Sequence, residues 1–190
     1  AELLWTGQEW AAAYVTAGQE VFGVELARLD GIGQLRGSVR RMTDARIGDV
    51  SAERRFAIAW NGQRYGLAWS ELRDGQRRLY FRWVSARGNP LSEPRELGVE
   101  GEVATSPALA AVGDGTLLLA WESEREGDRR VAVSLLDEEG NPQREPVTLR
   151  GVEGIATQPA LAVSADAVGV ATRSRRGISF HRVTLGNCRR

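Results

Sequence analysis

The chain has 190 residues, with 25 basic and 25 acidic side chains, so its formal net charge is zero. This balance argues against a nonspecific nucleic-acid binder, which draws its affinity mainly from a cationic surface. No apolar run approaches the roughly 20 residues that span a bilayer, so we expect no membrane-spanning segment. A composition that is 42% apolar with six Trp predicts a packed core.

Histidine and cysteine are too scarce for most site chemistries. The chain has one His and one Cys, whereas a zinc site of the usual kind takes three or four Cys or His ligands. A single Cys also allows no internal disulfide, so cysteine usage does not indicate the compartment. We therefore predict no metal site and no cofactor. All 25 basic residues are Arg, which we interpret as codon bias.

An internal repeat runs through the chain. Trp5–Trp10 (WTGQEW) aligns with Trp60–Tyr65 (WNGQRY) and with Val112–Leu117, at spacings of 55 and 52 residues, and a fourth copy begins at Ser164, again 52 residues on. Nine residues past each anchor stand Tyr14, Trp69, Trp121 and Arg173. The turn Gly88-Asn-Pro recurs as Gly140-Asn-Pro, also 52 residues apart. Several landmarks that keep one period indicate a true structural repeat.

Each repeat predicts four short strands. In the second repeat they are expected at 56–60, 65–69, 79–84 and 95–99, and in the third at 107–112, 117–121, 130–136 and 146–149. These runs are rich in β-branched and aromatic residues and are separated by Gly, Asn, Asp and Pro. The pair Asn61-Gly62 is typical of a tight hairpin turn between the first two strands.

Four antiparallel strands in about 50 residues match one blade of a β-propeller. The second strand of each repeat is apolar on both faces, as expected when blades stack face to face, and a sandwich would leave one face polar. We predict an all-β, single-domain β-propeller over residues 1–190. Its four blades of about four strands each are expected at 1–48, 49–102, 103–154 and 155–190, with the last blade incomplete.

The sequence resembles the β-propeller repeats of secreted or surface-attached bacterial proteins. The resemblance rests on the Trp-x-Gly-x-x-aromatic turn, the Ala-Trp that ends the second strand and the Gly-Asn-Pro turn. It covers essentially the whole chain and implies an extracellular, periplasmic or cell-surface location. The Gly-His and Trp-Asp signature of WD repeats is missing, and so is the Ser-x-Asp-x-Gly-x-Thr-Trp box of sialidase-like propellers.

Charged hairpin turns are the candidate binding residues. The turns between second and third strands share one end of a propeller with the connections between blades, and we call this the turn-bearing end. The candidates there are Asp74, Glu122, Glu124, Asp128, Arg175 and Arg176. Two of these carboxylates, or Glu71 with one of them, could serve glycoside hydrolysis. The alternative is that hairpin tips are charged because they are wet.

Two further residue types bear on function. His181 lies in a predicted third strand, so we expect an ordinary strand histidine and no Ser-His-Asp site. The tryptophans that recur with the repeat are expected to pack between blades and not to stack on carbohydrate. They are Trp5, Trp10, Trp60, Trp69 and Trp121. Trp83 has no Trp counterpart in the neighbouring copies, so its exposure is left open.

These observations favour a non-catalytic binding or assembly module that engages a protein partner or surface ligand. The alternative is a carboxylate-dependent glycoside hydrolase or lyase, or a carbohydrate-binding propeller. Because the last repeat lacks an outer strand, another polypeptide is expected to complete that blade by strand addition. This partner is a second copy, a separate subunit or a cleaved fragment. Cys188 is placed to form an intermolecular disulfide with it in an oxidising compartment. The alternative is a last blade of three strands with a frayed tail and a reduced Cys188.

Overall fold

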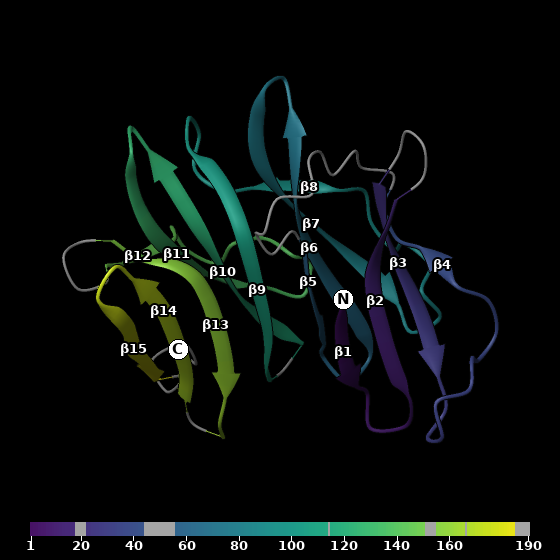
Figure 1. Ribbon diagram of the computed structural model, residues 1–190. Coiled ribbons are helices and arrows are strands. Elements are labelled where there is room, and N and C mark those ends of the chain that lie inside the picture. The colour runs from purple at the N-terminus through teal and green to yellow at the C-terminus, as the bar shows by residue number, and fades with distance from the viewer. Residues whose placement is uncertain (18–21, 44–55, 114, 151–154, 166, 185–190) are drawn as a thin grey trace.

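The computed structural model describes residues 1–17, 22–43, 56–113, 115–150, 155–165 and 167–184, and all its regular elements are β-strands. They form four separate antiparallel sheets, which we name I to IV in chain order (Figure 1). The predicted all-β class is confirmed. None of the described segments forms a helix long and apolar enough to cross a membrane.

Each sheet is a meander whose strands pair in sequence order. Sheet I contains β1 (Glu2–Trp5), β2 (Trp10–Ala17), β3 (Phe22–Leu29) and β4 (Arg40–Arg41). Sheet II contains β5 (Phe56–Trp60), β6 (Arg64–Arg73), β7 (Gln76–Ser85) and β8 (Arg95–Leu97). Sheet III contains β9 (Val103–Gly113), β10 (Thr116–Arg125), β11 (Asp128–Leu136) and β12 (Val147–Leu149). Sheet IV contains β13 (Thr157–Val163), β14 (Ala167–Ser174) and β15 (Gly177–Thr184).

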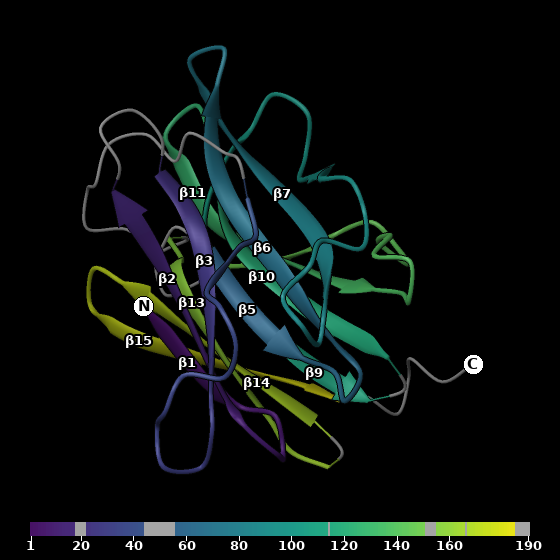
Figure 2. The same ribbon diagram turned by 90° about the vertical axis from the view of Figure 1, so that its right-hand side faces the viewer.

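The sheets follow one another in space as they do in the chain. The first strands of adjoining sheets contact each other, β1 against β5, β5 against β9 and β9 against β13. Sheets I and IV lie at the two ends of this row (Figure 1). The β6–β7 and β10–β11 hairpin turns lie at one end of the sheets, near the β8–β9 connection (Figure 2). This is the turn-bearing end.

Three hydrophobic clusters hold the row together, one between each adjoining pair of sheets. Between sheets I and II, Leu26 packs with Tyr65 and Trp69. Between sheets II and III, Phe81 packs with Trp121. Both faces of sheets II and III are therefore covered, which explains why their second strands are apolar on both sides.

The strand register of sheet IV corrects one alignment. In sheet III Ala120 pairs with Ala108, and in sheet IV Ala171 pairs with Ala160, which lies 52 residues after Ala108. The residue after Ala171, Thr172, therefore takes the position of Trp121. Arg173, which the constant spacing placed there, lies one residue further and on the opposite face. The β13–β14 hairpin of sheet IV is one residue shorter than the β9–β10 hairpin of sheet III, so the 52-residue spacing no longer holds on β14.

The tryptophans follow the prediction only in the middle sheets. Trp69 and Trp121 are buried as expected, whereas Trp5 is 48% exposed because no described sheet packs on its face of sheet I. Trp83, whose exposure the sequence left open, is buried at 2%. Its ring lies edge-on to Phe81 and under the Arg64 guanidinium, 4.1 Å from the guanidinium carbon.

A closed ring of four blades is not what the described residues form. Each hydrophobic cluster joins sheets that are neighbours in the chain, and none joins sheet IV to sheet I. Sheet IV has three strands among the described residues. Strand addition to its outer edge stays a prediction, and Cys188 lies outside the described residues.

Candidate functional site

The predicted turn residues lie at the tips of three hairpins. Asp74 is in the β6–β7 turn, where its backbone takes a positive φ of 51° ahead of Gly75. Arg175 and Arg176 form the exposed turn between β14 and β15. Asp128 begins β11, and its carboxylate is 3.9 Å from the Arg150 guanidinium. Asp74 belongs to sheet II, Asp128 to sheet III, and Arg175 and Arg176 to sheet IV, so they lie on three separate turns.

The structure does bring Glu122 and Glu124 together. They are two residues apart on β10, so their side chains leave the same face of sheet III. Arg129 lies between them, with N–O distances of 3.6 Å to Glu122 and 2.8 Å to Glu124. The Glu122 side chain is buried, and its carboxylate also accepts a hydrogen bond from the Gln158 amide at 3.4 Å. Glu122 thus ties sheet III to sheet IV, and Glu124 pairs only with Arg129 of its own sheet among the described contacts.

A larger acidic site lies at the same end, between sheets II and III. A cavity of about 550 Å³ is bounded by β7, β8 and the β8–β9 connection. Its lining includes three carboxylates, Glu96, Glu100 and Glu102, and the Arg78 guanidinium. Gly98 and Gly101 turn the connection with φ of 120° and 78°, values that disfavour other residues. We call this the acidic cavity, and its volume suits a small ligand such as a sugar.

Glu102 is the fixed point of the acidic cavity. Its side chain is 3% exposed, and it accepts hydrogen bonds from the Ser123 hydroxyl and the Arg130 guanidinium. Ser123 and Arg130 are directly opposite each other on β10 and β11, so the sheet itself sets their position. The Glu102 carboxylate is therefore fixed by one cation and one hydroxyl that come from the same sheet.

Glu96 occupies a wetter part of the lining. Its side chain is 48% exposed, and its oxygens accept hydrogen bonds from Arg78 at 3.1 and 3.2 Å and from the Tyr80 hydroxyl at 3.4 Å. The hydrogen bond and charge of Glu96 raise the pKa of Arg78. Burial, followed by the charge of Glu96, raises the pKa of Tyr80. The acidic cavity thus holds carboxylates in two environments, one buried and one open to water.

The sequence analysis named turns at this end of the fold but did not name these residues. Glu102 stands in the connection before an inner strand and has no counterpart in the other repeats, so the repeat gave it no emphasis. Its partner Arg130 looked like one of many surface arginines. The signal that could have found them is the Gly-x-x-Gly-Glu sequence at 98–102, which combines a tight connection with a carboxylate at a strand start.

The remaining features considered as sites are His181 and possible metal ligands. His181 on β15 faces sheet III, and its Nε2 atom is buried without a hydrogen-bond partner. This is the expected strand position, away from the acidic cavity. Within the described residues, no group of three or more His, Cys, Asp or Glu side chains could hold a metal ion.

Comparison with solved structures defines the class of fold. The subtype N10 neuraminidase-like protein of A/little yellow-shouldered bat/Guatemala/060/2010 matches 92% of this chain with a TM-score of 0.60 and 10% identity. The GH43 endo-arabinanase from Bacillus licheniformis matches 95% of it with a TM-score of 0.53 and 12% identity. No protein-family model and no curated protein matches the sequence. The fold is therefore of the β-propeller class.

The chain spans 56% of the neuraminidase-like chain and 71% of the arabinanase chain. The prediction that this chain is not an enzyme is corrected by these neighbours, because one is an endo-arabinanase and the other is neuraminidase-like, so the fold is shared with enzyme-type proteins.

Proposed function

We propose that the chain is part of a carbohydrate-active β-propeller that cleaves glycosidic bonds at the acidic cavity. The observation that carries the proposal is the placement of Glu96, Glu100 and Glu102 on one cavity of about 550 Å³ at the turn-bearing end. Glycoside hydrolysis commonly needs two carboxyl groups with different roles. The fold neighbours support the same class of chemistry.

The two environments assign the roles. Glu102, fixed by Arg130 and Ser123, stabilises an oxocarbenium-like transition state electrostatically. One of the two exposed carboxyl groups, Glu96 or Glu100, protonates the leaving oxygen. A water molecule then adds to the anomeric carbon and gives its proton to that same carboxylate, which restores the acid. Arg78 binds hydroxyl or carboxylate groups of the sugar at the rim.

A panel of aryl glycosides and soluble polysaccharides tests the proposal. Hydrolysis is detected as released phenol or new reducing ends, and lyase action as ultraviolet absorbance of an unsaturated product. We expect turnover of at least one substrate, with a loss of about 100-fold or more in Glu102→Gln, because removing one electrostatic stabiliser costs about that much. Glu93→Gln is the matched control, since Glu93 is exposed and lies outside the acidic cavity.

A further inference from the structure

The outward faces of sheets I and IV each resemble one side of the sheet–sheet contacts found inside the chain. In every sheet, the third strand places one residue directly opposite an alanine of the second strand. The four pairs are Ala13–Leu26, Ala68–Phe81, Ala120–Val133 and Ala171–Phe180. In the first three sheets the larger residue is buried against the next sheet, with exposures of 1%, 2% and 7%. Phe180 occupies the same position and is 70% exposed.

That face of sheet IV carries a second exposed apolar side chain, flanked by Arg173 and Arg182. Ile178 lies two residues from Phe180 on β15 and is 80% exposed, although its counterparts Leu79 and Val131 are fully buried. The strand register identifies these counterparts. Leu79 and Val131 each lie opposite the residue two positions after the alanine of their sheet, as Ile178 does in sheet IV. Gly169 lies against the ring of Phe180, so the aromatic side chain rests flat on the sheet. Sheet IV therefore presents a surface that in sheets I to III meets a following sheet.

Sheet I carries the complementary side of this contact, formed around Trp5 and Trp10. Trp5 pairs with Trp10 across β1 and β2, with ring centroids 4.9 Å apart and planes tilted by 56°. The corresponding pair in sheet II is Trp60 and Tyr65, 4.6 Å apart and tilted by 51°. Trp60 and Tyr65 pack in the cluster that contains Leu26 of sheet I. Trp5 and Trp10 have the same geometry, but no sheet among the described residues packs on their outer face, and Leu3 beside them is 63% exposed.

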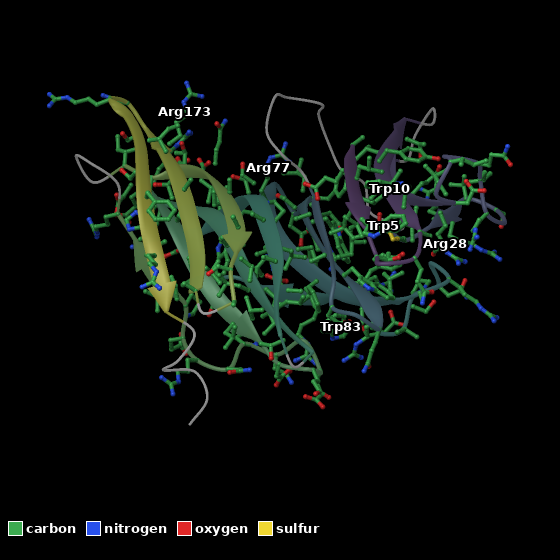
Figure 3. The ribbon with its side chains drawn as sticks, turned by 90° about the horizontal axis from the view of Figure 1, so that it is seen from below. Trp5, Trp10, Arg28, Arg77, Trp83 and Arg173 are labelled. Carbon is green, nitrogen blue, oxygen red and sulfur yellow. The ribbon has the colours of Figure 1, made fainter. Side chains whose placement is uncertain are left out.

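Figure 3 places these faces at the two ends of the molecule, with Trp5 and Trp10 on sheet I and Arg173 on sheet IV. Neighbouring exposed apolar side chains, such as Ile178 and Phe180, mark an interaction site. The in-chain contact between Leu26 and the Trp60–Tyr65 pair specifies what covers it, because Phe180 matches Leu26 and the Trp5–Trp10 pair matches Trp60–Tyr65. One chain carries both halves of the contact.

We propose that a second copy of this chain docks head to tail, so that sheet IV of each copy packs on sheet I of the other. Two copies related by a two-fold axis satisfy both free faces at once and close the row of sheets into a ring. The contact repeats the sheet–sheet packing already present three times in the chain. It buries the outward faces of β15 and β1, and it is separate from any strand added to the outer edge of β15.

Sedimentation equilibrium over a wide concentration range tests the proposal on the chain as it is. We expect a mass twice the 20.8 kDa of one chain. Phe180→Asp and Leu3→Asp should each weaken the dimer by about 100-fold or more, since each places a charge in one half of the contact. Both residues are exposed, so circular dichroism should show an unchanged β-sheet spectrum. Ile32→Asp is the matched control, because Ile32 is 82% exposed and lies in the β3–β4 connection, on neither face.

Three results overturn the proposal. They are a monomer at every concentration, a dimer that only one of the two variants dissociates, and an open series of trimers and larger species. The first result would point to a sheet supplied by a different polypeptide, the second to a contact between like faces and the third to a filament.

Discussion

Ser123 on β10 lies directly opposite Arg130 on β11, and both side chains bond to the carboxylate of Glu102. Neighbouring strands thus fix two donors around one buried anion at the start of an inner strand. Ser123 and Arg130 therefore support both the stability of sheet III and the position of the carboxylate proposed to act in the acidic cavity. Substituting either donor should change both the unfolding free energy and the proposed activity.

Arg130→Met should lower the free energy of unfolding by about 2–3 kcal/mol, because it leaves the buried Glu102 carboxylate without its cation. Urea denaturation at neutral pH measures the change. Arg144→Met is the control, since Arg144 is exposed on the β11–β12 connection. Equal stability of the two variants would contradict a buried ion pair. Adding Glu102→Gln to Arg130→Met should recover part of the loss.

Gly66→Ala should destabilise the chain by about 1–3 kcal/mol through overpacking. A Cβ atom at Gly66 would collide with the Leu117 side chain and press on the Phe81 ring, between sheets II and III. Thermal unfolding followed by circular dichroism gives the change. Gly31→Ala is the control, because no atom lies near its added Cβ. A neutral Gly66→Ala would mean that sheets II and III are not packed this closely.

Thr172→Val should stabilise the chain by about 1 kcal/mol. The Thr172 hydroxyl is buried without a hydrogen-bond partner, so replacing it with a methyl group of similar shape removes an unpaired polar group. Thr157→Val is the comparison, because the Thr157 hydroxyl donates to the Arg173 carbonyl at 3.2 Å. Chemical denaturation of both variants checks the difference, and a Thr172→Val that loses stability would place a partner on that hydroxyl.

Stability should fall as the pH rises from 10 towards 12. Burial, reinforced by the negative charge of Glu9 and opposed by Arg28, raises the pKa of Tyr65 to about 12 from 10.0. The folded state therefore keeps the neutral phenol, so this stabilisation is fully present below pH 10 and is lost as the pH rises through about 12. The loss amounts to about 2–3 kcal/mol. Unfolding free energies at pH 9 and 11.5 measure it, and Tyr65→Phe should show a shallower dependence. An equal slope in both proteins would contradict the assignment.

The sequence predicted the architecture through spacing and alternation. Trp69 and Trp121 recur at the repeat period because each fills the same place between two sheets, so this pattern predicted strands, sheet packing and the propeller class. The period could not register the missing residue in the β13–β14 hairpin. It therefore misplaced Arg173, since a change of one residue turns a strand side chain to the other face.

The site was harder to predict because it depends on contacts between segments that no repeat relates. Glu102, Ser123 and Arg130 are separated by up to 28 residues and meet only when sheet III has formed. Exposure at the end sheets was also hidden, because Trp5 and Phe180 have the same local pattern as their buried counterparts. Only the position of a sheet in the row decides which face is covered.

The most direct test of the proposed function compares kcat/KM of the native chain and of Glu102→Gln on a glycoside that the native chain cleaves. The account predicts measurable hydrolysis, a loss of about 100-fold or more in Glu102→Gln and native-like rates in Glu93→Gln. Circular dichroism of each variant confirms that the sheets are intact. Absence of turnover across the glycoside and polysaccharide panel, or a Glu102→Gln variant as active as the native chain, would contradict the account.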